Sequence, residues 1–333
     1  MHERTRTCAR TLEHAMKVSI VIVCMNRPDN LYPCLDCIST NTSVECKTYV
    51  VAYKYDKESL KEAVARYPWV EFIVSDEWRG FAENNNLALR KVDTPYTLII
   101  NDDTEFDGPM IDTMVADFEA LGDHAGIIAS PLYNQDGTIQ FCGRKGFSAG
   151  YYIRHAWHLA DNPSSFEGFE SIAVDGRALY RVGNVSGACF MIRSDLFRRL
   201  GFFDERFFFT PEDIALSEAV AKAGYGVFMD SSLHLVHKYH GSTSKMTACI
   251  RPAEIRGCLI HLSRGSVIRY VIIAFPVWAA EMSKRIKASV RCIIGETDRD
   301  RDRASLQVYR NTTRSIFSNK TTKEIFLKYL PKQ

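Results

Sequence analysis

Four apolar runs alternate with helix-like segments in the first third of the chain, and this alternation constrains the fold more than any other feature. The apolar runs are rich in β-branched residues and cover residues 18–24, 48–53, 70–75 and 96–100. Helical signals separate them; Asp56, for example, can cap the segment "KESLKEAVARY", which Pro68 ends. Because such alternation is typical of βα units, it predicts an α/β fold with a mostly parallel central sheet flanked by helices.

Size and composition allow a large buried core and exclude some partners. The chain has 333 residues, 46% of them hydrophobic, which suits one large or two modest domains. With 42 basic and 40 acidic residues the net charge is only +2, so we expect no nucleic-acid partner. The N-terminal segment lacks the apolar core of a secretory signal, and no uncharged apolar run reaches the ~18 residues of a membrane span. The sequence therefore predicts a cytoplasmic protein.

The ten cysteines do not indicate a disulfide framework. Several lie within apolar strand-like runs, as Cys24 and Cys189 do, and we expect them to be reduced and buried. Cys34 and Cys37 form a CxxC motif, but it lies in a helical segment with no second pair to complete a zinc site. We therefore expect neither a metal nor a redox role for this pair.

An acidic segment, "NDDTEFD", follows the fourth apolar run directly. Carboxylates are poor strand formers and are costly to bury, so their position needs a reason. In open α/β sheets, ligands bind beyond the carboxyl ends of the strands, where Asp102 and Asp103 are expected to lie. Asp107 and Pro109 can begin the next helix without them. The sequence thus predicts a ligand site at this end of the sheet.

Two more clusters of polar residues could complete the chemistry of such a site. Glu212 and Asp213 begin a helix after the segment "RFFFTP", and His234, His237 and His240 lie close together further on. Oxygen ligands with an imidazole suit Mg²⁺ or Mn²⁺, which can neutralise a departing diphosphate. A separate carboxylate could take the proton of an attacking hydroxyl. Together these clusters predict glycosyl transfer from a nucleotide sugar.

The three phenylalanines at 207–209 precede this helix. Three successive residues of an extended segment cannot all face the same side, because side chains alternate between the two faces. We therefore expect at least one of them to lie in the cleft beside Asp213.

Five motifs in order resemble glycosyltransferase family 2, which has the GT-A fold, and are most similar to its non-processive, rhamnosyltransferase-like bacterial branch. The resemblance runs from about residue 17 to 244. Its motifs are "VSIVIVCMNRPDNLYPCL", "GFAENNNLAL", "LIINDDTEF", the segment from "VSGACFMIR" to "EDIALSEAVAKAGY", and "VHKYHGS". The family's Gln-x-x-Arg-Trp motif does not occur, which argues against the polymerising synthases.

The resemblance implies roles at matching positions. Asp213 matches the catalytic base of an inverting transfer, with Glu212 helping to hold the acceptor. Asp103 matches the metal-binding second acid of the Asp-x-Asp motif, whose first position is Asn101 here, and His237 matches a histidine that reaches the metal or the diphosphate. Further donor contacts are implied at Asn26, Arg27, Asn85, Asn86 and Asp102.

One departure affects the choice of nucleotide. The family often has Asp-Asn-x-Ser after the second strand, where its aspartate contacts the base, whereas this chain has Ala52 and Tyr53 there. Asp56 could substitute for that aspartate. The expected donor is a UDP- or dTDP-sugar, and the expected acceptor is a hydroxyl group of a saccharide or a lipid-linked glycan.

Two alternatives from other classes remain at this point. A sugar-1-phosphate nucleotidyltransferase would carry a glycine-rich phosphate loop after the first strand, and "CMNRPDN" has no glycine. A catalytically inactive nucleotide-sugar binding module would lack donor hydrolysis and transfer, so an assay of donor hydrolysis separates it from an enzyme.

We expect a tail at 1–16, a GT-A domain at 17–245 and a helical extension at 246–333. Within the domain, 17–105 would form the nucleotide-binding half and 106–245 the acceptor half. Around residue 270 basic and apolar residues alternate. This pattern leaves two interpretations open, a helix on the inner membrane surface and a helix that packs on the main domain.

Overall fold

The computed structural model describes residues 16–238, 246–294 and 299–331. Its centre is a nine-stranded sheet with the strand order β3-β2-β1-β4-β11-β6-β12-β10-β9. The bounds of these strands are β1 (Val18–Cys24), β2 (Cys46–Tyr53), β3 (Val70–Ser75), β4 (Tyr96–Ile100), β6 (Ala125–Ala129), β9 (Ser171–Val174), β10 (Arg177–Arg181), β11 (Cys189–Arg193) and β12 (Gly226–Asp230). The first four strands are parallel, as the alternation predicts. Beyond β4 the sheet is mixed, because β11 runs antiparallel to both of its neighbours.

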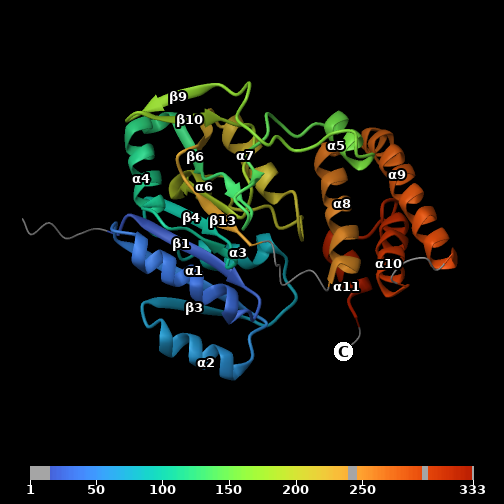
Figure 1. Ribbon diagram of the computed structural model, residues 1–333, viewed down its shortest axis with the longest axis horizontal. Helices are drawn as coiled ribbons and strands as arrows, with labels where there is room; N and C mark the ends of the chain where they lie inside the picture. The colour runs from blue at the N-terminus through green and yellow to red at the C-terminus, as the bar shows by residue number, and fades with distance from the viewer. Residues whose placement is uncertain (1–15, 239–245, 295–298, 332–333) are drawn as a thin grey trace, which may run out of the picture.

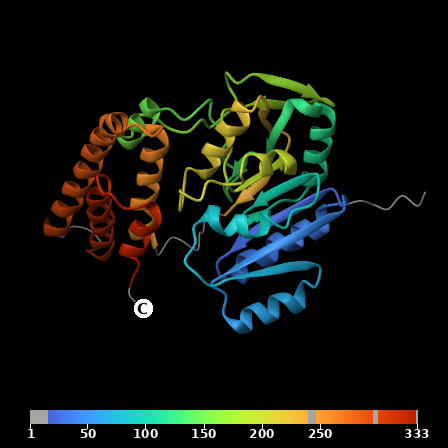
Figure 2. The same cartoon turned by 180° about the vertical axis from the view of Figure 1, so that it is seen from behind.

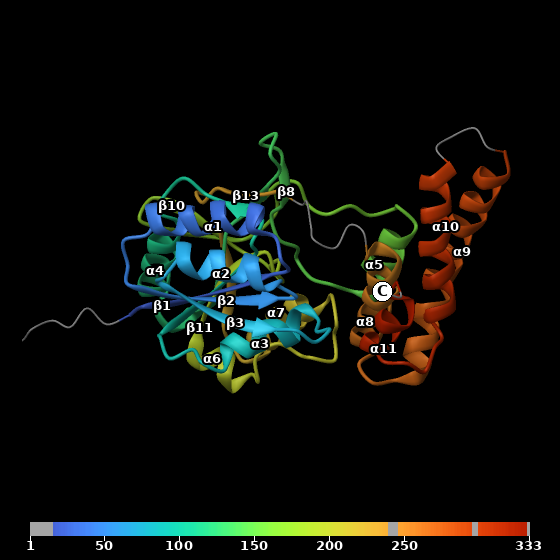
Figure 3. The ribbon, with the colours of Figure 1, turned by 90° about the horizontal axis from the view of Figure 1, so that it is seen from below.

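Helices cover both faces of this sheet, so the parallel strands β1, β2 and β4 are mostly buried, whereas the edge strand β3 is partly exposed. Figure 3 shows two helices, α1 (Pro28–Asn41) and α2 (Lys57–Arg66), above the sheet. Below it lie α3 (Phe81–Leu89) and α6 (Ser194–Arg199). The other helices of this part are α4 (Met110–Leu121), the 3₁₀ turn η1 (Gly122–His124) and α7 (Glu212–Lys222). This layering agrees with the α/β class expected from the sequence.

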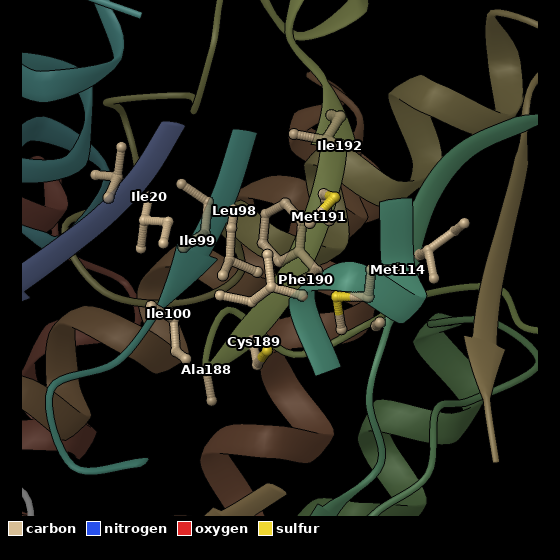
Figure 4. Close-up of a cluster of buried hydrophobic side chains, with 14 of the residues drawn as sticks. Ile20, Leu98, Ile99, Ile100, Met114, Ala188, Cys189, Phe190, Met191 and Ile192 are labelled. Carbon is tan, nitrogen blue, oxygen red and sulfur yellow. The ribbon is translucent and has the colours of Figure 1, made fainter. Parts of the chain in front are cut away.

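The core is centred on the two strands at which the sheet changes direction. Figure 4 shows Leu98, Ile99 and Ile100 of β4 beside Phe190 and Met191 of β11, all almost fully buried. Ile99 pairs directly with Phe190 in the antiparallel register. Apolar packing thus fixes the end of β4, from which the acidic segment leaves the sheet.

A small second sheet crosses the end of β4 and carries the histidine segment. Its strand order is β5-β13-β7-β8, with β5 (Thr104–Glu105), β7 (Leu132–Tyr133), β8 (Ile139–Phe141) and β13 (Leu235–His237). The register pairs His237 with Thr104. A residue more than a hundred positions away is therefore held beside the acidic segment.

The C-terminal part forms a helical unit beside the sheet, in orange and red in Figures 1 and 2. It contains α8 (Thr247–Ser263), α9 (Val267–Ile294), α10 (Arg299–Ser315) and α11 (Thr322–Tyr329), together with α5 (Ala149–Ala156) from the middle of the chain. An apolar cluster joins α5, α8 and α9. None of the described helices combines the length and the apolar character needed to cross a membrane.

The helical unit is fastened to the sheet-containing part by direct contacts. Lys323 forms an ion pair of 2.7 Å with Glu83 of α3, and the Thr322 hydroxyl donates to the Arg206 carbonyl at 2.7 Å. A Cβ added at Gly257 of α8 would lie 2.5 Å from the Thr210 carbonyl oxygen, so only glycine allows this approach. These contacts place α8 against the loop that leads into α7.

The cysteines of the described residues are free thiols. Cys34 is buried, and its Sγ donates to the Asn101 carbonyl at 3.6 Å. Burial raises the pKa of the Cys37 thiol. A reactive thiol needs a lowered pKa, so the structure gives this CxxC motif no nucleophile at neutral pH.

Candidate functional site

Two cavities lie on either side of the point where the two sheets meet. The strand-end cavity, of about 230 Å³, lies at the carboxyl ends of the strands and is lined by Tyr53, Arg79, Asn84, Asp102, Asp103 and Phe209, among others. The interdomain cavity, of about 440 Å³, lies between the sheet-containing part and the helical unit. Its lining includes Gln140, Arg144, Tyr151, Asp213, His237 and Cys258.

Asp103 and His237 form the boundary between these cavities. His237 Nε2 lies 3.2 Å from Asp103 Oδ1, and both side chains are almost completely buried. His237 Nδ1 lies 2.6 Å from Gln140 Oε1. Asn101, which replaces the first acid of the expected motif, places its Nδ2 3.5 Å from His237 Nε2. The structure therefore brings both predicted metal ligands together.

The hydrogen bonds of Gln140 determine which nitrogen of the His237 ring carries the proton. Gln140 Nε2 donates to Asn134 Oδ1 at 2.9 Å and to the His237 carbonyl at 3.2 Å, so its Oε1 is the acceptor toward the imidazole. Nδ1 must then carry a proton, and in the neutral ring Nε2 presents a lone pair to the Asp103 carboxylate. Two acceptors 3.2 Å apart repel each other unless a positive charge lies between them, either a proton on Nε2 or a metal cation.

This arrangement fits a divalent cation. An imidazole that is oriented through its other nitrogen is the usual form of a metal-ligating histidine. The described residues contain no group of three or more His, Cys, Asp or Glu side chains placed to hold a metal. Two protein ligands still suit Mg²⁺ or Mn²⁺, since such ions in phosphate-transfer sites take their remaining ligands from water and substrate phosphates.

Asp102 is buried beside this pair and lacks a partner on one oxygen. Its Oδ2 has no hydrogen bond, although the side chain is only 8% exposed. Burial raises its pKa to about 7, the charge of Asp103 adds to the rise, and Cys24 and Arg27 oppose it. A buried unpaired acceptor is costly, so a ligand hydroxyl bound here would gain a strong hydrogen bond.

The predicted donor contacts Asn26, Arg27 and Asp56 are held by one another and by the following helices. Asn26 Nδ2 donates to Asp56 Oδ2 at 3.0 Å, and Asp56 caps α2 by accepting from the Ser59 amide at 2.8 Å. Arg27 donates to both carboxylate oxygens of Asp29, at 3.1 and 3.0 Å. None of the three predicted residues is among those that line the strand-end cavity.

The structure corrects the prediction for the asparagine triplet in α3. All three asparagines are buried and hydrogen-bonded within the protein, and Asn84, which was not predicted, is the one that also lines the strand-end cavity. Asn85 Nδ2 donates to the Phe81 carbonyl at 2.9 Å, and Asn86 binds the backbone of Phe203 through both its amide nitrogen and its oxygen. Successive helix positions are turned by about 100° from one another, so only one of the three can face the cavity.

Two residues of the strand-end cavity, Tyr53 and Arg79, were not identified from the sequence. Tyr53 occupies the position where the family's aspartate was expected, and its hydroxyl accepts from the Arg79 amide at 3.2 Å. Arg79 contributes a cation to the lining. One of the three phenylalanines was expected beside Asp213, but Phe209 lines the strand-end cavity instead, and Phe207 and Phe208 are buried in the core. The tight approach of Gly80 to the Phe208 carbonyl brings this loop to the cavity.

Asp213 is positioned by backbone amides at the start of α7 and faces the interdomain cavity. Its Oδ2 accepts from the Gly187 amide at 2.9 Å and its Oδ1 from the Ile214 amide at 2.7 Å. Burial raises the pKa of Asp213, and these amides together with the charge of Arg144 reduce the rise. A carboxylate that is oriented in this way, with a raised pKa, has the properties of a general base.

Glu212 is not part of the cavity lining, in contrast to its predicted role in holding the acceptor. It is 6% exposed, and its Oε2 has no hydrogen-bond partner. Burial raises its pKa well above the usual value, and the charges of Asp213 and of Glu254 in α8 add to this. Adjacent residues at the start of a helix point in different directions, so Asp213 faces the cavity and Glu212 faces the protein interior.

The wall of the interdomain cavity opposite Asp213 comes from a region with no clear sequence pattern. Arg144 is held by Asn162 and Asn184, at 2.8 and 3.2 Å. Tyr151 and His155 of α5 stack with their ring centres 5.8 Å apart. Aromatic rings beside polar groups suit the faces and hydroxyls of a sugar. Their only sequence signal was an aromatic-rich segment, "GFSAGYYIRHAWH".

The two other histidines of this segment are His234 and His240. His234 packs its ring against Tyr133 at 4.4 Å between centres and lines neither cavity. His240 lies outside the described residues.

Comparison with known proteins decides the family. The family model described as "Glycosyl transferase family 2" matches residues 19–201, more than half of the chain. The chain belongs to this family. It is therefore a glycosyltransferase, of the rhamnosyltransferase-like type that the motifs indicate.

Two bacterial relatives share about a quarter of their aligned residues with this chain. The "O-antigen biosynthesis protein RfbC" of Myxococcus xanthus is 26% identical over 244 residues, which are 72% of this chain but only 18% of that protein. The "N-acetylglucosaminyl-diphospho-decaprenol L-rhamnosyltransferase" of Mycobacterium tuberculosis is 25% identical over 223 residues, 60% of this chain and 69% of that protein.

Solved structures of glycosyltransferases confirm the GT-A fold. GalNAc-T7 with UDP, GalNAc and Mn²⁺ superposes with a TM-score of 0.53 at 14% identity, over 96% of this chain and 57% of that one. The mannosyltransferase PcManGT of Pyrobaculum calidifontis, in complex with GDP-Man and Mn²⁺, gives 0.50 at 13% identity, over 91% and 88%. At these identities the likeness concerns the fold alone.

Proposed function

We propose that this glycosyltransferase moves a sugar, with inversion at the anomeric carbon, from a nucleoside diphosphate to a hydroxyl of a saccharide or lipid-linked acceptor. The observation that carries the proposal is the position of the Asp103–His237 pair. The pair separates a strand-end cavity with a cationic side chain from a second cavity that contains a buried carboxylate. A donor in the first cavity would present its reactive carbon to an acceptor in the second.

The strand-end cavity has the groups that a nucleotide sugar needs. Asp103 and His237 would hold a divalent cation, Mn²⁺ or Mg²⁺, which when bound neutralises the diphosphate and so stabilises it as a leaving group. Arg79 supplies a further positive charge, and Asp102 an acceptor for a ribose or sugar hydroxyl. Tyr53 offers a ring against which the base can pack, and we propose a uracil or thymine nucleotide.

On the acceptor side, Asp213 would take the proton of the attacking hydroxyl. The Gly187 amide fixes the direction of the carboxylate, and α8 covers the site from the side of the helical unit. A single displacement assisted by one base inverts the configuration at the anomeric carbon. The name of the mycobacterial relative includes a diphosphate lipid, which supports a lipid-linked acceptor here. We further propose that the protein acts in the cytoplasm, at the inner face of the membrane.

The donor part of the proposal can be tested by thermal shift with UDP, dTDP and GDP, each with and without Mn²⁺. A ligand that binds only the folded state raises the melting temperature by mass action. We expect UDP or dTDP to stabilise the protein only with Mn²⁺, and Asp103→Ala and His237→Ala to abolish this. His234→Ala is the matched control and should retain the shift.

Two results would contradict this assignment. A metal-independent shift would show that Asp103 and His237 do not bind through a cation. The absence of any shift, together with the absence of donor hydrolysis, would identify the chain as an inactive module of the same fold.

A further inference from the structure

The outward face of α9 is apolar along its whole length. Ile268, Ile272, Phe275, Ile286 and Ile293 are 75%, 65%, 62%, 57% and 84% exposed. At 100° per residue these five positions lie within about 60° of one another around the helix axis, and they span about 38 Å along it. We call this surface the α9 stripe. Isolated exposed apolar residues are common, but a continuous row of this length marks a contact surface.

The opposite face of α9 is already used within the protein. Ile273, Ala274, Val277 and Ala280 are buried against the rest of the helical unit. Figure 1 shows α9 as the outermost helix, at the end of the molecule away from the sheet. Only one side of α9 is therefore open to a partner, which must present a flat apolar surface.

Charges on α9 are arranged asymmetrically around the stripe. Arg269 and Lys287 project about 120° from Phe275 around the axis, and Arg285 lies on the other side. The only carboxylate of α9, Glu281, is 1% exposed and is held by Arg251 and Lys284 at 2.9 Å each. The stripe is thus bordered by cations on both sides and by no acid of its own helix.

We propose that the α9 stripe lies flat on a bilayer that contains anionic lipid, with the apolar side chains inserted among the acyl chains and the flanking cations at the headgroups. Amphipathic helices with this division of apolar and basic residues bind at the membrane interface, and anionic lipid strengthens them by electrostatic attraction. A second copy of the chain fits less well. Self-association through the stripe would bring its bordering cations close to those of the other copy, with no acid of α9 to oppose them.

Two further cavities lie between α9 and the interdomain cavity. Ser283, Lys284, Lys287 and Arg291 line a cavity of about 230 Å³ at the side of α9. A neighbouring cavity of about 300 Å³ shares Lys284 with it and Thr210 with the interdomain cavity that contains Asp213. If the proposed function holds, these cavities would give the headgroup of a glycolipid anchored in the bilayer a route toward Asp213. Membrane binding itself does not depend on that function.

The test is flotation of the full-length chain with two kinds of vesicle, one of phosphatidylcholine alone and one that also contains about 30% phosphatidylglycerol. At that content of anionic lipid a single basic residue contributes a measurable attraction. We expect binding to the anionic vesicles that weakens with salt. Ile272→Glu with Phe275→Glu should abolish it, and Arg269→Glu with Lys287→Glu should weaken it by about tenfold or more. The matched control is Val74→Glu, at an exposed apolar residue of β3 that is 52% exposed.

Fluorescence quenching by lipids tests whether the stripe contacts the bilayer, and it needs no charge substitution. Trp278 stacks on Phe275 at 6.1 Å between ring centres, at the edge of the stripe. Brominated lipids should quench its fluorescence, and Trp278→Phe should remove most of the quenching. Melting curves of every variant establish that it is folded.

Three outcomes would overturn the proposal. The wild type could fail to float with anionic vesicles, or the double glutamate variant could float as well as the wild type. The protein could also be a dimer that Ile272→Glu with Phe275→Glu separates, with no vesicle binding, which would make the stripe a protein interface. None of these results would affect the nucleotide-dependent thermal shift, so failure here is distinguishable from failure of the proposed function.

Discussion

The strand-end and interdomain cavities are built in different ways. The first is formed by consecutive βα units, whose strands are parallel and whose carboxyl ends therefore meet at one edge. The second combines α5, the loop before α7, and α8, which are separated by up to about a hundred residues. The comparison teaches that the donor half of the site follows from the sheet, whereas the acceptor half depends on how separate segments dock.

The largest effect should come from Asp213→Asn, because this substitution removes the base of the interdomain cavity and leaves nucleotide binding in the strand-end cavity intact. Loss of a general base lowers turnover by about 10² to 10⁴. One of the two amides, of Gly187 or Ile214, can still donate to the single side-chain oxygen of asparagine. The strand-end cavity is not changed, so the nucleotide-dependent thermal shift should be unchanged. Initial rates of sugar transfer measure the effect, and Glu212→Gln serves as the neighbouring control with nearly normal turnover. Full activity of Asp213→Asn would remove Asp213 from the mechanism.

Arg177→Met should cause the largest loss of stability in the sheet. Arg177 of β10 pairs with Asp117 at 2.5 Å and also with Asp230, and both carboxylates are 0% exposed. Removing this cation leaves two buried carboxylates together, which costs about 3–5 kcal/mol of unfolding free energy. Urea unfolding monitored by circular dichroism measures this cost. Arg181→Met, at an exposed position of the same strand, should change stability little; equal losses would mean that the ion cluster is not the cause.

The pH dependence of transfer should include the ionisation of Asp213 in the interdomain cavity, to which Asp102 of the strand-end cavity, whose pKa burial raises to about 7, adds its own step. Because burial raises the pKa of Asp213, the ionised base is lost as pH falls, and the rate should drop about tenfold per pH unit below that pKa. The charge of Arg144 lowers this pKa, so Arg144→Met should move the acid limb to higher pH. Arg154→Met, at an exposed position of α5, should leave it in place. A shift to lower pH in Arg144→Met would contradict the assigned direction.

A smaller effect is expected from Gly257→Ala, which acts on the docking of α8. The new Cβ would lie 2.5 Å from the Thr210 carbonyl oxygen, and backbone must move to relieve this contact. Overpacking of this kind costs about 1–3 kcal/mol. We expect a raised KM for the acceptor with an unchanged KM for the donor, measured by steady-state kinetics. A raised donor KM would show that the two cavities are not independent.

The smallest effects should distinguish Asn84 from Asn85. Asn84→Ala should raise the donor KM, because this side chain lines the strand-end cavity. Asn85→Ala should lower stability by about 1 kcal/mol through loss of its bond to the Phe81 carbonyl, with an unchanged donor KM. Isothermal titration with the preferred nucleotide and thermal melting measure the two quantities. Reversed results would restore the interpretation made from the sequence.

The sequence alone determined the nucleotide half of the fold and several of its polar residues. Local patterns were sufficient there, because strand and helix signals alternate and parallel strands bring their ends to one edge. The positions of Asp102, Asp103 and Asp213 followed from strand and helix ends. The choice among Asn84, Asn85 and Asn86 did not, since it depends on the rotation of α3 against the sheet.

Tertiary structure alone decided the rest. It placed His237 beside Asp103 through the pairing of β13 with β5, turned Glu212 away from the cavity, and brought α5 into the helical unit. Residue patterns report burial and local conformation, which act over one or two turns of chain. Which distant segments touch is set by the packing of whole elements, and no local pattern encodes that choice.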